Sequence, residues 1–149
     1  MLEVNAIGRL PAGFKKSDII SLAVLAWKKA GGTGVAEMSL TATDDRRIRA
    51  LNRKHRGKDK TTDVLSFGQA ESKGLPHPKG SVRQLGDVFI SVPQVRRQAK
   101  VIRRSVRAEF ALMVVHGTLH LMGFDHETLK QEGVMFRLQH DILLKAGYF

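Results

Sequence analysis

The sequence contains no cysteine, which excludes a disulfide scaffold, a thiolate metal site and a cysteine nucleophile. It has no run of about 18 apolar residues, so we expect no membrane-spanning helix. The first ten residues lack the apolar core of a signal peptide, and the absence of cysteine fits a reducing compartment; together these features favour a cytoplasmic protein. Aromatic residues make up only 6% of the chain, too few for extensive stacking against nucleic-acid bases.

The length of 149 residues corresponds to about one domain, which can bury roughly two-thirds of the surface that the unfolded chain exposes. A hydrophobic fraction of 42% is normal for a globular protein and argues against a disordered chain. The sequence shows no internal repeat, low-complexity segment or boundary that would divide it. We therefore expect residues 1–149 to form a single domain.

Acidic residues are scarce relative to basic ones: 14 Asp and Glu stand against 25 Lys and Arg, a net charge of +11. A domain this basic attracts polyanions, usually nucleic acid or an anionic membrane face. The positive charge gathers in two segments. Residues 46–60 hold eight Lys and Arg with one acid, and residues 96–107 hold six with none. This concentration favours contact with phosphate groups, the ordinary alternative being a solvated basic surface.

The pattern of apolar residues predicts an α+β fold, a small mixed sheet covered by about five helices. Helical periodicity predicts a first helix that Ser17 caps and that ends near residue 30. A second helix begins at a cap formed by Asp44 or Asp45 and ends near residue 54. The strands are predicted at residues 2–7, 37–43, 63–67 and 86–92.

The segment between the last two strands, residues 69–84, is rich in Gly, Pro and Ser and predicts a mobile surface loop. From Pro93 the pattern is helical to the end of the chain. A continuous helix over 93–107 would carry four basic side chains on one face, where they would contact the phosphates of a substrate. These side chains are Arg96, Lys100, Arg103 and Arg107.

Three of the six histidines lie within eleven residues, and their spacing predicts a metal site. His116 and His120 stand four residues apart after a wholly apolar run, so both rings leave the same face of a buried helix. Gly123 allows a turn that brings His126 back to the same point as a third ligand. Three neutral nitrogens with one open position are typical of catalytic rather than structural zinc.

A carboxylate often orients such a ligand through the second ring nitrogen, and we expect Asp125 or Glu109 to do so here. The other histidines, His55, His77 and His140, are interpreted as ordinary packed or surface residues.

The same spacing resembles the metallopeptidase motif His-Glu-x-x-His-x-x-Gly-x-x-His, except that Gly117 stands where the glutamate belongs. That glutamate is the general base of the peptidases, so its absence argues against peptide hydrolysis. Cleavage of a phosphodiester needs it less, because cations can stabilise the charged phosphoryl oxygens.

Residues 116–126, His-Gly-Thr-Leu-His-Leu-Met-Gly-Phe-Asp-His, resemble the signature of the bacterial YbeY family of endoribonucleases. Residues 51–60 with 62–67, and residues 85–91, resemble further segments of that family in the same order. The sequence departs from the family pattern at four positions, none of them a ligand, and its net charge is higher than that of many members. The four positions are His55, Thr61, Gly68 and Phe124.

The resemblance implies a zinc-dependent hydrolase that cuts single-stranded RNA, with one Zn²⁺ held by His116, His120 and His126. It implies a role in ribosomal RNA processing at the 3′ end of the small-subunit RNA, in ribosome biogenesis and in ribosome quality control. The partners would be ribosomal RNA and the ribosome or its subunits. It also assigns the active-site arginine to Arg56, whose planar guanidinium suits a phosphate group.

Two alternatives remain open at this point. One is a metal hydrolase with a substrate other than RNA, such as a peptide or a small molecule. The other is a non-catalytic ribosome-assembly factor whose metal only braces the fold. The choice between water and the 2′-hydroxyl as nucleophile, the cleavage site and the oligomeric state also stay open.

Overall fold

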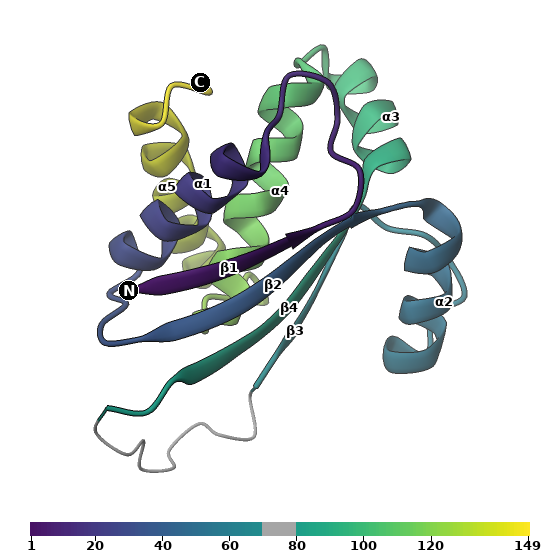
Figure 1. The fold of residues 1–149 in the computed structure, drawn as a ribbon. Helices are drawn as coiled ribbons and strands as arrows, with labels where there is room; N and C mark the ends of the chain where they lie inside the picture. Colours follow the sequence, from purple (N-terminus) through teal and green to yellow (C-terminus); the bar gives the residue numbers. More distant parts are fainter. Residues whose placement is uncertain (70–79) are drawn as a thin grey trace.

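The computed structural model describes residues 1–69 and 80–149 (Figure 1). Its strands form one sheet in the order β1-β2-β4-β3, in which β1, β2 and β4 are parallel and β3 runs antiparallel to β4. The prediction of an α+β fold with a small mixed sheet is confirmed. The strands are β1 (Leu2–Ile7), β2 (Ala36–Thr43), β3 (Val64–Gly68) and β4 (Arg83–Ser91).

Alternation along β2 explains why the sheet has one covered face. Met38 and Leu40 are buried on that face, while Glu37 and Ser39, which alternate with them, are partly exposed on the other. The same alternation puts Val88 of β4 into the core. The buried face is therefore apolar and accepts a layer of helices.

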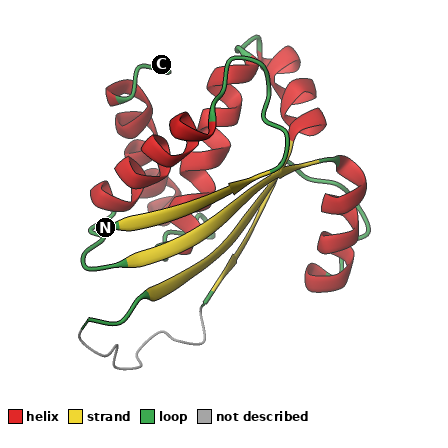
Figure 2. Ribbon diagram, in the orientation of Figure 1, coloured by secondary structure: helices red, strands yellow, loops and turns green. Residues whose placement is uncertain are grey.

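Four of the helices pack together on that side of the sheet, and α2 lies outside this group, where it contacts β3, β4 and α3 (Figures 1 and 2). The number matches the expectation of about five helices within the described residues. The helices are α1 (Lys16–Lys29), α2 (Asp45–Arg56), α3 (Val92–Ile102), α4 (Val106–Leu121) and α5 (Leu129–Lys145).

Helix α4 lies at the centre of the core. It packs against α1, α3 and α5 as well as against β3 and β4, so it is buried on nearly all sides. Its apolar side chains include Phe110, Val114 and Leu119, which are fully buried. A helix covered in this way holds the side chains at its C-terminal end in fixed positions.

The first two helices begin at different kinds of cap. Asp44 accepts a hydrogen bond from the backbone N–H of Arg47 at 2.9 Å, which confirms one of the two predicted caps of α2. The prediction that Ser17 caps α1 is wrong, because Ser17 lies inside the helix. There the Asp18 carboxylate turns back and accepts from the backbone N–H of Lys15 at 2.8 Å.

The predicted continuous helix over 93–107 is wrong as well. Helix α3 ends at Ile102, and Arg103 takes the left-handed conformation with φ 55°. Ser105 then caps α4 by accepting from the backbone N–H of Ala108 at 3.0 Å. The chain therefore reverses between the two helices, and the four basic residues predicted for one helix face are divided between them.

The last two residues of the predicted loop over 69–84, Arg83 and Gln84, belong to β4 instead. Its residues 70–79 lie outside the described residues. In the part of the chain that the structure describes, no helix has both the length and the apolar character needed to cross a membrane.

Asp45, the first residue of α2, joins three elements. Its Oδ1 accepts hydrogen bonds from the Ser91 hydroxyl at 2.8 Å, the Arg97 guanidinium at 2.9 Å and the Thr61 hydroxyl at 3.1 Å. Burial acts to raise the pKa of Asp45, but the bonds from Ser91, Arg97 and Thr61 outweigh it and hold the pKa below its ordinary value. The carboxylate thus fixes the start of α2 against the end of β4 and against α3.

We expect Asp45→Asn to lower the free energy of unfolding by about 1–3 kcal/mol at pH 7, because a charged acceptor of three hydrogen bonds is lost. The folded pKa lies below the ordinary value of 3.8, so the carboxylate stabilises the fold above that pH and loses its effect as the pH falls through the lowered pKa. Denaturant titrations should show the difference between the two proteins shrinking in acid. A difference that stays constant into strong acid would contradict the assignment.

Candidate metal centre and active site

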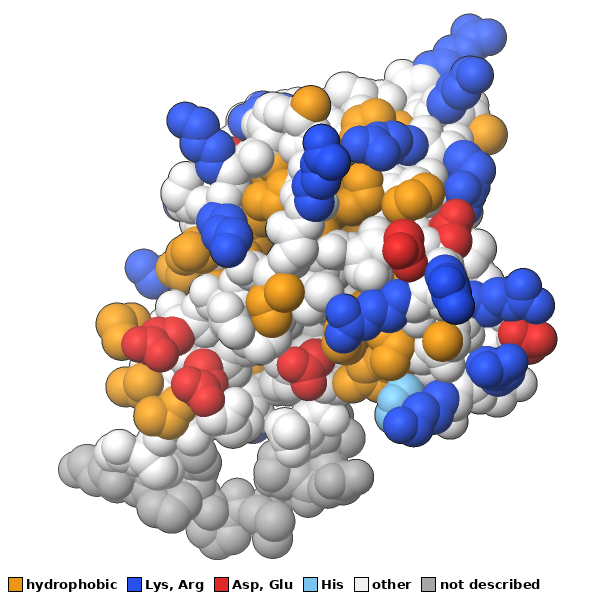
Figure 3. All heavy atoms as spheres, turned by 45° about the vertical axis from the view of Figure 1, so that its right-hand side comes forward, with side chains coloured by type: hydrophobic (Ala, Val, Ile, Leu, Met, Phe, Trp, Pro, Cys, Tyr) orange, Lys and Arg blue, Asp and Glu red, His pale blue; other side chains and the backbone are white. Residues whose placement is uncertain are grey.

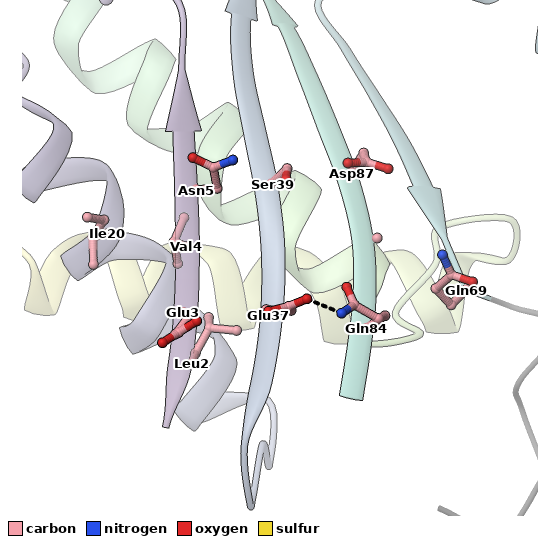
Figure 4. A pocket seen from close by; sticks show the side chains of 11 residues that line it. Leu2, Glu3, Val4, Asn5, Ile20, Glu37, Ser39, Gln69, Gln84 and Asp87 are labelled. Carbon is pink, nitrogen blue, oxygen red and sulfur yellow. Dashed lines mark hydrogen bonds between the residues drawn. The ribbon is translucent and has the colours of Figure 1, made fainter. Parts of the chain in front are cut away.

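Two hollows among the described residues bear on function, and they lie on different parts of the sheet. One, of about 560 Å³, lies on the face away from the helices, where polar side chains such as Asn5, Ser39 and Asp87 stand in front of the strands (Figure 4). The Gln84 amide donates to the Glu37 carboxylate across it. None of the residues that line this hollow is a histidine.

The second hollow, of about 930 Å³, holds all three predicted histidine ligands and Arg56. It lies between the C-terminal end of α2, the strands β3 and β4, and the C-terminal end of α4 with the turn that follows. We call it the histidine cleft. Its basic lining residues are Arg56, Lys58, Lys60 and Arg83.

His116 and His120 extend from successive turns of α4, and their Nε2 atoms lie 3.0 Å apart. The chain then turns at Gly123, with φ 95°, which confirms the predicted turn. The turn brings the ring of His126 to 5.4 Å from the ring of His116 and 5.2 Å from that of His120, measured between centroids. One ligand nitrogen from each histidine lies within 4.8 Å of the others, close enough for a single metal ion.

A buried glutamine determines which nitrogen of His116 faces this point. Gln139 of α5 is 6% exposed, and its carbonyl oxygen Oε1 bonds to Nδ1 of His116. Because Oε1 only accepts, Nδ1 carries the proton and Nε2 keeps its lone pair for a metal. Gln139 therefore orients the ligand in the way that was predicted for a carboxylate.

The two carboxylates named from the sequence have other partners. Glu109 is buried and bonds to Arg104 at 3.0 Å and to Gln98 at 3.4 Å, so the prediction that it orients a histidine is wrong. Asp125 accepts from the backbone N–H of His126 at 2.8 Å. Its negative charge also acts on His120, where it favours the protonated form of the imidazole.

Burial keeps two of the imidazoles neutral. Desolvation, together with the neighbouring His116 and His126, lowers the pKa of His120 to about 4, against the smaller opposing effects of Asp125 and the Phe124 carbonyl. Burial also lowers the pKa of His116. At neutral pH both side chains therefore present lone pairs rather than positive charge. Neutral imidazoles are the donors that zinc and similar divalent metals accept, so this donor set fits such an ion.

Gly117, between the two ligands of α4, faces the sheet at close range. A Cβ atom there would lie 2.5 Å from Cγ1 of Val88 and 3.4 Å from the hydroxyl of Ser66. A side chain at this position would therefore push α4 away from β3 and β4. The absence of the peptidase glutamate is thus a requirement of the packing, and no carboxylate base can enter the cleft at this position.

Arg56 ends α2 and reaches β3. Its Nη2 donates to the backbone carbonyl of Ser66 at 2.7 Å, and its guanidinium lies 5.3 Å from the ring centroid of Phe67. The Ser66 hydroxyl donates to the carbonyl of Gly117 at 3.4 Å, next to His116. Ser66 thus connects Arg56 to α4, and the remaining guanidinium N–H groups are available to an anion in the cleft.

The four basic residues predicted for one helix face do not line the histidine cleft. Arg107 lies at the opposite end of α4 from His116, about 13 Å away along the helix axis at 1.5 Å per residue. Its guanidinium lies 4.5 Å from the ring centroid of Tyr148. Arg96 and Lys100 lie on α3, and Arg103 lies after its end. The contact of these four residues with substrate stays a prediction. Any such contact would occur outside the histidine cleft.

The first basic segment behaves differently, because Arg56, Lys58 and Lys60 do line the cleft. Arg83 joins them from β4, although the sequence pattern placed it in a loop. Figure 3 shows Lys and Arg side chains spread over the side of the molecule that carries α2 and α3, with acidic side chains at the lower left and a few more among the basic ones at the right. A polyanion that approaches this side meets positive charge before it reaches the cleft.

Comparison with known proteins agrees with this arrangement. A family model described as Endoribonuclease YbeY matches residues 15–147. The chain belongs to the YbeY family of endoribonucleases. Proteins named Endoribonuclease YbeY are similar to it in Geobacillus kaustophilus, with 46% identity over 75% of this chain and 74% of that protein, and in Sulfurihydrogenibium, with 48% identity over 73% and 69%.

A third relative of that name, from Moorella thermoacetica, is 46% identical over 78% of this chain and 77% of its own length. The solution structure of a Thermotoga maritima protein has a similar fold, with a TM-score of 0.63 over 97% of this chain and 89% of that one, at 24% identity. These matches confirm the family resemblance and the fold class.

We expect Gly117→Ala to lower the free energy of unfolding of this YbeY family member by about 1–3 kcal/mol, because Val88 or the helix must move. Gly133→Ala on α5 is the matched control: its Cβ would meet nothing within 4 Å, and alanine favours the helix. Denaturant unfolding should show opposite changes in the two variants. Equal stabilities would mean that the packing of α4 does not require residue 117 to lack a side chain.

We expect Gln139→Leu to weaken metal binding about 10- to 100-fold, because His116 loses the partner that fixes its ring and its tautomer. Gln139→Glu keeps an acceptor at the same place and should retain most of the affinity. Competition with a coloured chelator measures both. Wild-type affinity in Gln139→Leu would show that the hydrogen bond does not orient the ligand.

Proposed function

We propose that this YbeY family member is a zinc-dependent endoribonuclease that cuts single-stranded RNA in the cytoplasm, with residues 1–149 acting as one domain. The observation that carries the proposal is the convergence of His116, His120 and His126 in one cleft with Arg56. The relatives' name supports RNA as the substrate class.

Zinc is the metal that this donor set favours. Three imidazole nitrogens from His116, His120 and His126 would hold it, and the chain has no cysteine that could close the site with a fourth sulfur ligand. When bound, zinc supplies a Lewis acid that stabilises negative charge on oxygen atoms in the cleft. The buried Gln139 keeps the first ligand in the orientation that this requires.

Arg56 is the group of the chain that would bind the phosphate undergoing cleavage. One of its N–H groups is held by the Ser66 carbonyl, which fixes the plane of the guanidinium toward the cleft. The other N–H groups would donate to the phosphoryl oxygens and stabilise the charge that develops on them. Lys58, Lys60 and Arg83 would hold neighbouring phosphates, so binding should weaken as salt increases.

The proposed biological substrate is ribosomal RNA, with action at the 3′ end of the small-subunit RNA and in ribosome quality control. Membership of the YbeY family and the net charge of +11 support this assignment. The ribosome or its subunits would then present the strand to the enzyme. A peptide substrate is disfavoured, because Gly117 occupies the position of the peptidase base and cannot be enlarged without a clash.

Cleavage of end-labelled single-stranded RNA by matched variants tests the proposal. His120→Ala should lose both bound zinc and cleavage, because one of three ligands is gone. Arg56→Ala should keep its zinc but cut about 10²- to 10³-fold more slowly, as expected when a group that stabilises developing charge is removed. Arg9→Ala, an exposed arginine outside the cleft, is the control for general loss of charge.

Metal content should be measured on the same samples by mass spectrometry. Cleavage by His120→Ala at the wild-type rate would place the chemistry elsewhere. If zinc-loaded wild type binds RNA but leaves it intact both free and in ribosomal subunits, the metal braces an assembly factor and the enzyme proposal is wrong.

A further inference from the structure

An exposed phenylalanine lies beside the metal centre and has no place in the core. Phe136 of α5 is 44% exposed, although Met135 next to it is fully buried. Its ring centroid is 6.3 Å from that of His126, and the two ring planes are inclined by 39°. A large aromatic face is therefore presented to solvent at the edge of the site where RNA would be cut.

A glycine adjoins this phenylalanine on the surface of the same helix. Gly133 precedes Phe136 by three residues, so the two are neighbours on α5. A Cβ atom at Gly133 would meet nothing within 4 Å, and its φ is not in the left-handed region. Neither packing nor backbone conformation requires glycine here, although glycine is the poorest helix former after proline. Its effect is to leave bare backbone beside the ring of Phe136.

Phe136, Gly133 and the ring of His126 together form a strip that we call the rim platform. It joins an open aromatic face to a metal ligand that is itself exposed. Aromatic side chains on proteins that bind single strands stack on nucleobases, and any base can stack because each has a π face. Bare backbone beside the ring lets a planar group approach closely.

We propose that the rim platform stacks one unpaired nucleobase of the RNA, next to the phosphate held at the metal centre. The inference rests on the proposed function and adds a subsite to it. A base inside a duplex is already stacked on both sides and cannot lie on the platform, so the subsite selects for single strands. One platform is consistent with the low aromatic content, which excludes only extensive stacking.

Binding of two strands of equal length separates stacking from attraction to phosphate. One is a labelled single-stranded RNA, and the other is a strand of the same length and charge that lacks its bases. Phe136→Ala should weaken binding to the RNA about 5- to 100-fold and leave binding to the abasic strand unchanged. Stopped-flow anisotropy reads the binding before any cleavage.

Phe149→Ala is the matched control, because Phe149 is 41% exposed but packs on Arg104 and His140. It should bind both strands as the wild type does. Equal weakening of both strands by Phe136→Ala, or no weakening of either, would overturn the proposal. Equal weakening would mean a general structural role, and no weakening would leave the ring for an apolar partner such as a protein.

Gly133→Gln gives a second test whose two readouts move in opposite directions. The variant should unfold at a higher denaturant concentration, because it replaces glycine in a helix without any clash. It should nevertheless bind the base-bearing RNA several-fold more weakly, since its side chain covers the platform. If it binds RNA as tightly as the wild type, Gly133 is not part of a subsite.

These measurements distinguish the subsite from the proposed function. If the wild type prefers base-bearing RNA through Phe136 but never cuts it, the proposed subsite stands and the proposed enzyme activity is refuted. A wild type that cuts RNA while Phe136→Ala binds both strands normally keeps the enzyme and refutes the subsite.

Discussion

Helix α4 can lie against β3 and β4 only because residue 117 has no side chain, and the geometry of the cleft depends on that contact. With a Cβ at 2.5 Å from Val88, the helix would stand further from the sheet. His116 and His120 flank the glycine, so their positions relative to Ser66 are set by the same contact. The positions of these two ligands are therefore fixed by the packing of the core, which is close and rigid.

The second support of the cleft is α2, which is held to the rest of the fold by polar groups along its length. Asp45 anchors its beginning, Asn52 donates to the Lys60 carbonyl at 2.9 Å, and Arg56 at its end bonds to Ser66. Ile48 is its fully buried apolar anchor. Because the helix is fixed at both ends, the guanidinium of Arg56 is held in place. It lines the cleft across from the histidines of α4. Hydrogen bonds rather than apolar area orient this helix.

Much of the metal centre could be predicted because its residues are close in sequence. A separation of four residues on a helix fixes the relation of His116 to His120, and a glycine turn accounts for His126. The contribution of Gln139 could not be predicted in the same way, since its contact with His116 spans 23 residues and depends on how α5 packs on α4. Its one signal is a polar residue among the buried positions of α5.

The error over 93–107 has a local cause. The helical periodicity of the sequence continues through Arg103. This residue nevertheless adopts a left-handed backbone conformation, which an arginine side chain does not predict. Ser105, two residues before the end of the predicted helix, is a cap signal that the periodicity conceals. Arg83 was missed for a related reason, since β4 begins within a segment rich in turn-forming residues. Helix and strand limits depend on tertiary partners that short sequence patterns do not include.

Two of the three imidazoles, those of His116 and His120, are already unprotonated in the folded chain near neutral pH. A metal that enters therefore displaces no proton from either of them. The heat that these two ligands contribute to metal uptake is then free of buffer ionisation. Their share of the affinity also stays level across small changes of pH around neutrality. Burial of these two ligands thus makes their part in loading the site respond to metal supply more than to pH.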